Sequence, residues 1–262
     1  MTAGQATAVA ERSTWPLGDL LDNRRWVRRA EPFAHAVAHD VFVPEFYAEL
    51  ERQFITLMAE HPEAFHRDMK GYDAAGAVLR EGQDGPLGIF VSREWHDLVA
   101  AVAGVAATGD VSASLHHHGP GGRSGWPHND LNPGWFGGQP VDGEIILAGR
   151  DGVSYQTGDH PAGVPARRTV RAVSVLFYLA NPVWSSGDGG ETGLYRGLRD
   201  RHPVAVVPPI NNSLLLFECT PYSFHGFVGN RVSPRNSLVM WVHRDYDEAV
   251  ARWGEDSIVR WS

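Results

Sequence analysis

The chain has 262 residues, of which 43% are hydrophobic and 10% aromatic, and its 31 acidic residues outnumber 23 basic ones. A chain of this length and composition can bury a large core, and we expect residues 1–262 to form a single domain. The acidic excess leaves no overall positive field for a phosphate backbone, which argues against nucleic-acid binding.

Cysteine usage and hydropathy predict the compartment. Cys219 is the only cysteine, so no intrachain disulfide can form, as is usual in a reducing cytosol. The N-terminal sequence lacks the apolar segment of a signal peptide, and the longest apolar stretches fall well short of the roughly 20 residues that span a bilayer. We therefore expect a cytoplasmic protein with no membrane partner.

Residues 1–108 are predicted to be mainly helical. Apolar residues recur at helical spacing over 44–63, and a second helix is predicted over 92–107 with Ser92 as a possible N-cap. The basic run at 23–31 is interpreted as a solvated helix face rather than a binding patch.

Residues 110–244 are predicted to be β-structure, because short apolar runs alternate there with Gly, Pro, Asn and Asp. About eight runs at this spacing predict an all-β sandwich or jelly roll, with the N-terminal helices covering one sheet. The runs are VSASLHHH, EIILAG, VSYQT, RAVSVLFYLA, VAVVP, NSLLLFE, YSFHGFV and RNSLVMWVHR. A short helix is predicted at 245–254 on the outside of the molecule.

Three His-x-Asp triplets are candidate metal sites, because residues two apart in a strand project from the same face. His66-Arg67-Asp68 follows a helix without a strand pattern around it, and His243-Arg244-Asp245 ends the last predicted strand. His128-Asn129-Asp130 instead follows one strand and precedes several more that can supply further ligands. A turn in which Asp130 caps the backbone remains the alternative interpretation.

The segment 220–242 favours the metal interpretation. His225 lies in an aromatic-flanked strand, and Arg235 and Ser237 share a face of the next strand, whereas Arg231 lies in a turn and is expected to be solvated. Two histidines and one carboxylate on converging strands form the facial triad of non-haem Fe(II) oxygenases. A buried arginine beside the metal is what a dicarboxylate co-substrate requires, because guanidinium binds carboxylate through a planar fork.

With these motifs in this order, residues 110–244 resemble the Fe(II)/2-oxoglutarate-dependent oxygenases, in particular the prolyl-4-hydroxylase-like branch. The motifs that carry the resemblance are HHHGPGG, His128-x-Asp130, FYLANPVWSSGDGGETGLY, His225 and Arg235-x-Ser237. The resemblance implies a mainly β fold with a double-stranded β-helix (jelly roll) core. It also implies that His128, Asp130 and His225 bind Fe(II).

The resemblance further implies a pocket for 2-oxoglutarate. Arg235 would bind its distal carboxylate with help from Ser237, and Tyr178 and Thr192 would line the pocket. His118 stands where the family often has a tyrosine, so its contact with the co-substrate stays open.

The reaction implied by the resemblance consumes O2 and 2-oxoglutarate, releases succinate and CO2, and is stimulated by ascorbate. Related radical halogenases carry a small residue in place of the carboxylate of Asp130, so halogenation is not expected. Hydroxylation, desaturation, epoxidation and ring formation stay open. We expect a small-molecule substrate, with a prolyl or other amino-acid or peptidyl hydroxylase as the nearest variant.

Two alternatives come from other classes. One is a metal-free jelly-roll binding protein, against which the intact ligand set argues. The other is a cupin-like metalloenzyme that uses His116-x-His118, although the glutamate expected a few residues later is missing.

The segment 131–170 is longer than a simple connection between strands. EIILAG and VSYQT flank RDG, which predicts a hairpin. This insertion is interpreted either as a substrate lid, with Trp135 and Phe136 near the metal, or as an inert surface hairpin. Trp241 and Phe217 are interpreted as core side chains.

Overall fold

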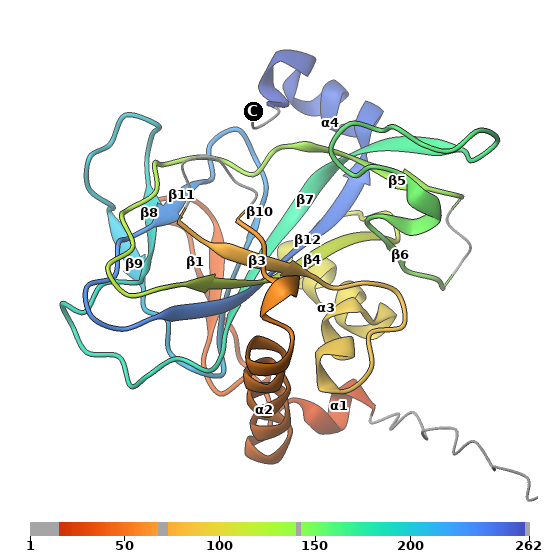
Figure 1. The fold of residues 1–262 in the computed structure, drawn as a ribbon. Coiled ribbons are helices and arrows are strands. Elements are labelled where there is room, and N and C mark those ends of the chain that lie inside the picture. The colour runs from red at the N-terminus through yellow and green to blue at the C-terminus, as the bar shows by residue number, and fades with distance from the viewer. Residues whose placement is uncertain (1–15, 68–72, 140–142, 260–262) are drawn as a thin grey trace, which may run out of the picture.

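The computed structural model describes residues 16–67, 73–139 and 143–259, and these are mostly β-structure in a nine-stranded mixed sheet and a three-stranded antiparallel sheet (Figure 1). The strands are β1 (Val27–Arg29), β2 (His35–Ala38), β3 (Ala75–Val78), β4 (Asp110–His118), β5 (Pro133–Gly137), β6 (Ile146–Leu147), β7 (Ala166–Tyr178), β8 (Thr192–Tyr195), β9 (Ala205–Val207), β10 (Ser213–Glu218), β11 (Phe224–Phe227) and β12 (Arg235–Asp245). The helices are α1 (Leu17–Leu20), α2 (Pro44–Glu60), α3 (Arg93–Ala103) and α4 (Tyr246–Trp253), with short 3₁₀ turns at Pro62–Ala64, Pro86–Val91, Arg150–Gly152 and Glu255–Ser257.

The large sheet has two chemically different faces. Its strands run in the order β1-β2-β10-β7-β12-β4-β3, with β5 paired to β7 and β6 to β4. Because successive strand residues project to opposite faces, Phe177 of β7 joins a cluster that contains helical side chains, whereas its neighbours Leu176 and Tyr178 join a smaller cluster. One face of the large sheet is therefore covered by helices, and the other face packs against the three-stranded sheet.

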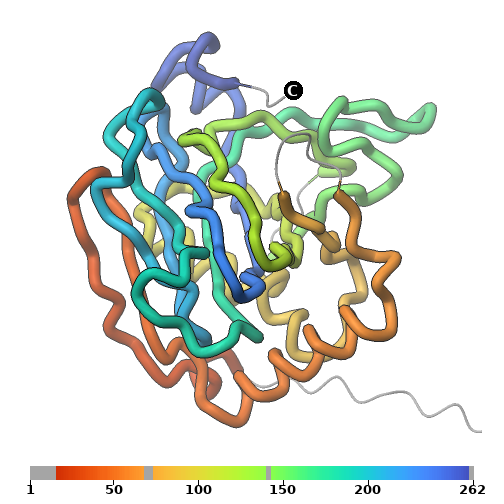
Figure 2. The backbone as a smooth tube through the Cα atoms, turned by 60° about the vertical axis from the view of Figure 1, so that its left-hand side comes forward, coloured from red at the N-terminus to blue at the C-terminus, as the bar shows by residue number. Residues whose placement is uncertain are grey.

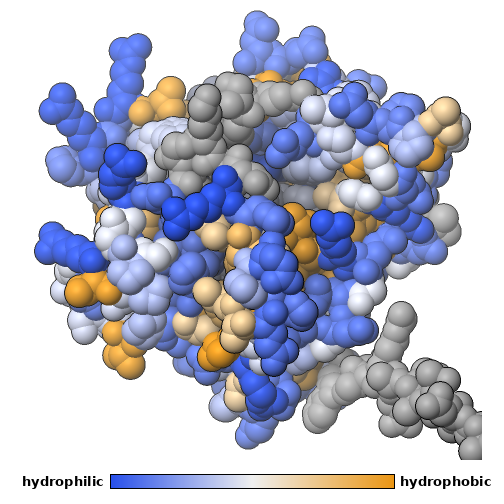
Figure 3. Space-filling view, viewed as in Figure 1, coloured by the Kyte–Doolittle hydropathy of each residue, from blue (hydrophilic) through white to orange (hydrophobic). Residues whose placement is uncertain are grey.

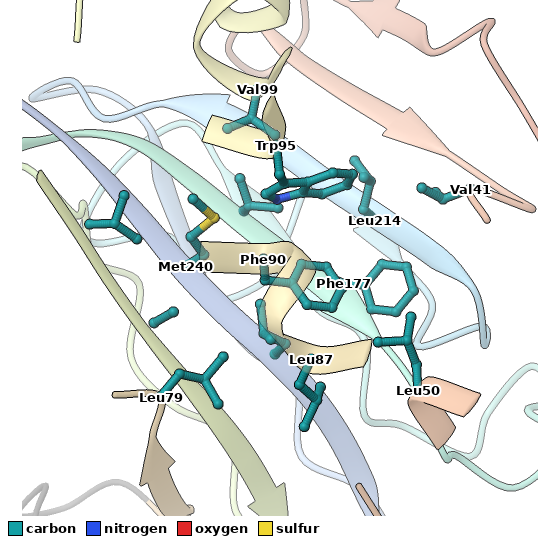
Figure 4. Packing of buried hydrophobic residues seen from close by; sticks show 14 of the residues in the cluster. Val41, Leu50, Leu79, Leu87, Phe90, Trp95, Val99, Phe177, Leu214 and Met240 are labelled. Atoms are coloured by element: carbon teal, nitrogen blue, oxygen red, sulfur yellow. The ribbon is translucent and has the colours of Figure 1, made fainter. Parts of the chain in front are cut away.

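The helix-covered face holds the main hydrophobic core (Figure 4). Trp95 of α3 and Phe90 of the preceding 3₁₀ turn are fully buried, with ring centroids 5.3 Å apart. Phe90 also reaches Phe177 of β7 at 5.0 Å, and Leu50 of α2 lies in the same cluster. Side chains of α2 and α3 therefore pack on this face of the large sheet.

The three-stranded sheet, in the order β11-β8-β9, packs on the other face, where Leu194 of β8 shares a cluster with Tyr178 of β7. In the register of this sheet, His225 of β11 lies opposite Leu194. The chain approaches β8 through Gly189, whose φ is +78° and whose added Cβ would lie 2.0 Å from the carbonyl oxygen of Gly229. Only glycine permits this approach, so the turn before β8 depends on it.

The first third of the chain, which was predicted to be mainly helical, also contains strands. β1 lies within the basic run 23–31, because β2 pairs with β10 on one edge and leaves the other edge for β1. Pairing between distant segments has overridden the local sequence pattern. The helix predicted over 92–107 ends at Ala103, since Gly104 adopts a left-handed conformation with φ 71°.

The hairpin predicted in the insertion is wrong. Ile146 and Leu147 pair in parallel with β4, and residues 153–157 form no strand. A parallel partner already occupies the β6 backbone, so no hairpin forms around Arg150–Gly152. The structure instead adds β5, which pairs with β7, and β8, neither of which was predicted. Residues 143–165 lie on the opposite side of the molecule from β1 and β2 (Figure 2).

The surface seen in Figure 3 is largely hydrophilic, with apolar side chains scattered in small groups. None of the helices in the described ranges combines the length and apolar character that a bilayer span requires.

Replacement of Phe177 by alanine tests the main core. Phe177 is fully buried, so Phe177→Ala should lower the free energy of unfolding by about 3 to 5 kcal/mol. The control is Val183→Ala, whose side chain is 94% exposed and which should stay within about 0.5 kcal/mol. Urea unfolding of both variants measures the difference, and equal losses would contradict this description of the core.

Candidate metal centre

A two-residue backbone ladder brings two histidines from distant parts of the chain together. The backbone N–H of His128 donates to the carbonyl of His225 at 2.9 Å, and the reciprocal bond is 2.8 Å long. The two imidazole centroids are 4.4 Å apart. His225 belongs to β11, so the second sheet fixes one ligand and this ladder then fixes the other.

Hydrogen bonds to carbonyl oxygens orient both imidazoles. Nδ1 of His128 lies 3.0 Å from the carbonyl of Trp126, and Nδ1 of His225 lies 3.2 Å from the carbonyl of Ser223. A carbonyl only accepts, so each Nδ1 donates, and in the neutral ring this leaves the lone pair on Nε2. This is the tautomer that metal-binding histidines use when a backbone carbonyl holds their other nitrogen.

Asp130 completes the group. Its carboxylate lies 3.4 Å from Nε2 of His225 and 3.9 Å from Nε2 of His128, and the candidate ligand atoms of the three residues all lie within 4.8 Å of one another. One carboxylate oxygen accepts from Ser174 at 2.9 Å and from the indole of Trp241 at 2.8 Å. A buried carboxylate together with two imidazoles is a donor set for a divalent first-row metal.

The charge states match this donor set. Burial alone would raise the pKa of Asp130, but its interactions with His225, Arg171 and His128 hold that pKa well below its usual value. Burial, together with the nearby His225, lowers the pKa of His128 to about 4. At neutral pH Asp130 is therefore ionised and His128 neutral, which are the forms that bind a metal.

Arg235 forms a second, anion-binding feature on the same face. It is 2% exposed, and its guanidinium donates to Ser237 at 3.0 Å and to Thr192 at 3.2 Å. Thr192 is also 2.7 Å from the hydroxyl of Tyr178. Within the described residues Arg235 has no carboxylate partner, and its buried Nε has no hydrogen-bond partner. A buried cation without a counter-ion is costly, so this pocket suits an anionic ligand such as one end of a dicarboxylate.

The strand register assembles the pocket. Arg235 of β12 is opposite His118 of β4, and Ser237 is opposite Tyr178 of β7. His118 stacks on Phe227 at 3.9 Å between ring centroids. Burial and the nearby Arg235 lower the pKa of His118 to about 2, so its neutral ring adds no second positive charge beside the guanidinium.

Three residues that contact Asp130 were not predicted to be site residues: Ser174, Arg171 and Trp241. Arg171 lies 3.4 Å from the carboxylate and stacks over the Trp241 ring at 3.7 Å. Trp241 was interpreted as core, yet it donates to Asp130. The available signal was spacing, because Trp241 lies an even number of residues after Arg235 and so shares its strand face.

The other His-x-Asp triplets have structural roles or lie partly outside the described ranges. His66 makes a backbone bridge with Gly76, and Asp68 falls outside the described residues. His243 is buried between Thr169 and Tyr155. Its neighbours are also engaged: Arg244 pairs with Glu218 at 2.8 Å, and Asp245 caps α4.

The two expected substrate contacts, Trp135 and Phe136, lie on β5 and pack against residues of the insertion. Phe136 is fully buried, with its ring 4.8 Å from His243 and 5.5 Å from Tyr155. Trp135 is half-buried beside Gly158. Phe217 packs on His225 at 4.7 Å, as its interpretation as a core residue suggests.

Residues 114–243 match the family model of the 2OG-Fe(II) oxygenase superfamily. No match was found among curated proteins. A prolyl-4-hydroxylase from Pseudomonas putida aligns with a TM-score of 0.53 and 17% identity, over 80% of this chain and 92% of that one.

Two further solved structures show the same fold. Prolyl 4-hydroxylase from Phytophthora capsici gives a TM-score of 0.55 and 20% identity, over 87% of this chain and 63% of that one. A prolyl hydroxylase from Trichoplax adhaerens gives a TM-score of 0.56 and 18% identity, over 83% and 86% of the two chains.

Alanine variants separate the ligand histidines from a decoy. His128→Ala and His225→Ala each remove one of three protein ligands and should abolish Fe(II) binding, whereas His66→Ala should keep it. Anaerobic Fe(II) titration of the folded variants measures this. Iron loss in His66→Ala with retention in His128→Ala would contradict the assignment.

Proposed function

Through residues 114–243 the chain belongs to the 2OG-Fe(II) oxygenase superfamily, and we propose that it oxidises a small anionic molecule with Fe(II), 2-oxoglutarate and O2. The single observation that carries the proposal is the pairing of two features on one face. His128, Asp130 and His225 offer a three-ligand metal site, and Arg235 offers a buried cation without a protein counter-ion.

The chain's own residues have distinct tasks in this reaction. When bound, Fe(II) and 2-oxoglutarate together supply O2 activation and C–H oxidation, with succinate and CO2 as co-products. His128, Asp130 and His225 would hold Fe(II) as its three protein ligands, a set that in non-haem iron oxygenases leaves positions open for co-substrate and oxygen. Arg235 binds the distal carboxylate of 2-oxoglutarate through its planar fork, assisted by Ser237.

The remaining pocket residues orient and enclose the co-substrate. Tyr178 and Thr192 are buried and hydrogen-bonded to each other, so they form a wall of the pocket beside Arg235 that is shielded from water. The neutral ring of His118 lies across the strand pair from Arg235 and offers a polar contact. Exclusion of water strengthens the interaction between guanidinium and carboxylate.

Arg171 supports an anionic small-molecule substrate. It donates Nε to Tyr155 and Nη1 to Asp130, while Nη2 has no acceptor among the described residues, and its side chain stays 15% exposed. If Asp130 held Fe(II), its charge would be shared with the metal, and Arg171 beside it would keep positive charge without a counter-charge. A carboxylate or phosphate on the substrate would supply the counter-charge.

The second candidate is a prolyl or other peptidyl hydroxylase. It is favoured by the fold shared with the Trichoplax adhaerens enzyme, whose structure contains a hypoxia inducible factor oxygen degradation domain peptide fragment.

We also propose that the core is a double-stranded β-helix (jelly roll). The large sheet and the β11-β8-β9 sheet pack face to face, and His225 lies on the smaller sheet. This arrangement supports a double-stranded β-helix.

Succinate formation tests the oxygenase proposal. Purified protein with Fe(II), 2-oxoglutarate and ascorbate as the proposed stimulant should release succinate slowly, and Asp130→Ala should not. Small organic acids should raise the rate, whereas their amides and end-blocked proline peptides should not. Stimulation by the peptides alone would instead favour the peptidyl candidate.

The two arginines after His225 test the co-substrate pocket. Breaking a buried charge pair costs about 2 to 5 kcal/mol, so Arg235→Gln should weaken 2-oxoglutarate binding roughly 30-fold or more. Arg231 is exposed, and Arg231→Gln should stay within about threefold. Anaerobic 2-oxoglutarate titration of each Fe(II)-loaded variant measures both effects, and the reverse ranking would refute the assigned anchor.

A further inference from the structure

One side chain of the insertion reaches from the surface segment towards the metal centre. Tyr155 is half-buried, and its hydroxyl lies 3.0 Å from Nε of Arg171 and 3.1 Å from Nε2 of His243. Its ring packs edge-on against Phe136 and His243. The backbone is also tied down, because the N–H of Trp135 donates to the carbonyl of Tyr155 at 3.0 Å.

Thr169 sets the direction of the hydrogen bonds that connect His243, Tyr155 and Arg171. Thr169 donates its hydroxyl proton to the carbonyl of Gly134, so it accepts from Nδ1 of His243. Nε2 of His243 then accepts from the Tyr155 hydroxyl, and the Tyr155 oxygen accepts from Nε of Arg171. The contacts therefore have one consistent arrangement of protons, which fixes the tyrosine rather than leaving it to rotate.

Arg171 transmits this fixed position to the metal ligand. Its Nη1 lies 3.4 Å from one carboxylate oxygen of Asp130, and its Cζ lies 3.7 Å from the ring centroid of Trp241, which donates to the other oxygen at 2.8 Å. Arg171 and Trp241 therefore each hold one of the two carboxylate oxygens of Asp130. Tyr155 is the partner that sets where the guanidinium of that pair lies.

We propose that Tyr155 is a positioning residue of the metal centre and that the insertion braces this centre rather than closing over it as a lid. The inference rests on the proposed function, because it assumes that Asp130 binds the metal. Loss of a group that orients a metal ligand typically lowers metal affinity by about 10- to 100-fold. Tyr155 acts through Arg171, so the lower end of that range is expected.

Metal affinity, not turnover, is the direct test. Co(II) is titrated anaerobically into the wild type, Tyr155→Phe and a control, Tyr222→Phe. Tyr222 is 71% exposed. Tyr155→Phe keeps the ring and loses only the hydroxyl, so Co(II) affinity should fall about tenfold. Tyr222→Phe should change it by no more than about threefold.

Two readouts separate positioning from general damage. The 2-oxoglutarate affinity of Tyr155→Phe at saturating metal should stay within about threefold, since Arg235 is held independently. In an Arg171→Gln background, Tyr155→Phe should have no further effect on Co(II) affinity, because the proposed route through Arg171 to Asp130 has been removed.

A glycine variant provides a second perturbation that removes no polar group. A Cβ at Gly134 would lie 2.4 Å from the Tyr155 ring and 2.9 Å from His243, so Gly134→Ala should displace Tyr155 and also weaken Co(II) binding. Gly18→Ala, with nothing within 4 Å of the added Cβ, is its control. If Tyr155→Phe does not fold, Gly134→Ala takes its place in the double-mutant test.

The outcomes are separable. Wild-type affinity retained in both Tyr155→Phe and Gly134→Ala, or full additivity of Tyr155→Phe with Arg171→Gln, would overturn the brace while leaving the oxygenase proposal intact. A wild-type protein that binds no Co(II) would overturn both.

Discussion

A carboxylate that is only 4% exposed needs donors or cations around it, and the surroundings of Asp130 meet this need from several elements at once. Ser174 comes from β7, Trp241 from β12 and His225 from β11. Each element must hold its register for its side chain to reach the carboxylate. The position of Asp130 is therefore a consequence of the packing of both sheets, and the metal site depends on it.

The division of the large sheet into two faces makes this packing possible. One face carries the apolar core under α2 and α3, so the helices stabilise the sheet without approaching the ligands. The other face carries buried polar groups, including the cation of Arg235, which an apolar core could not tolerate unpaired. Helix-side burial thus supports a sheet whose second face is available for binding.

The strand period explains how much of the site was predictable. Side chains two apart share a face, so His128 with Asp130 and Arg235 with Ser237 were readable as pairs from the sequence. His118 and Tyr178 followed from the family resemblance, and the register places them opposite Arg235 and Ser237.

The parts that were not predicted depend on long-range pairing. β1 needs the edge that β2 offers, and β6 needs the parallel partner β4, neither of which a local pattern contains. Tyr155 contacts Arg171 and His243, which lie 16 and 88 residues away in sequence, so its environment could not be predicted from the local sequence either.

The central claim is that His128, Asp130 and His225 bind iron while Arg235 binds the co-substrate. Anomalous diffraction at the iron edge, from anaerobic crystals with Fe(II) and 2-oxoglutarate, tests this claim most directly. One peak within bonding distance of His128, Asp130 and His225, with a co-substrate carboxylate on Arg235, is the predicted result, whereas iron bound elsewhere or a carboxylate away from Arg235 would contradict it.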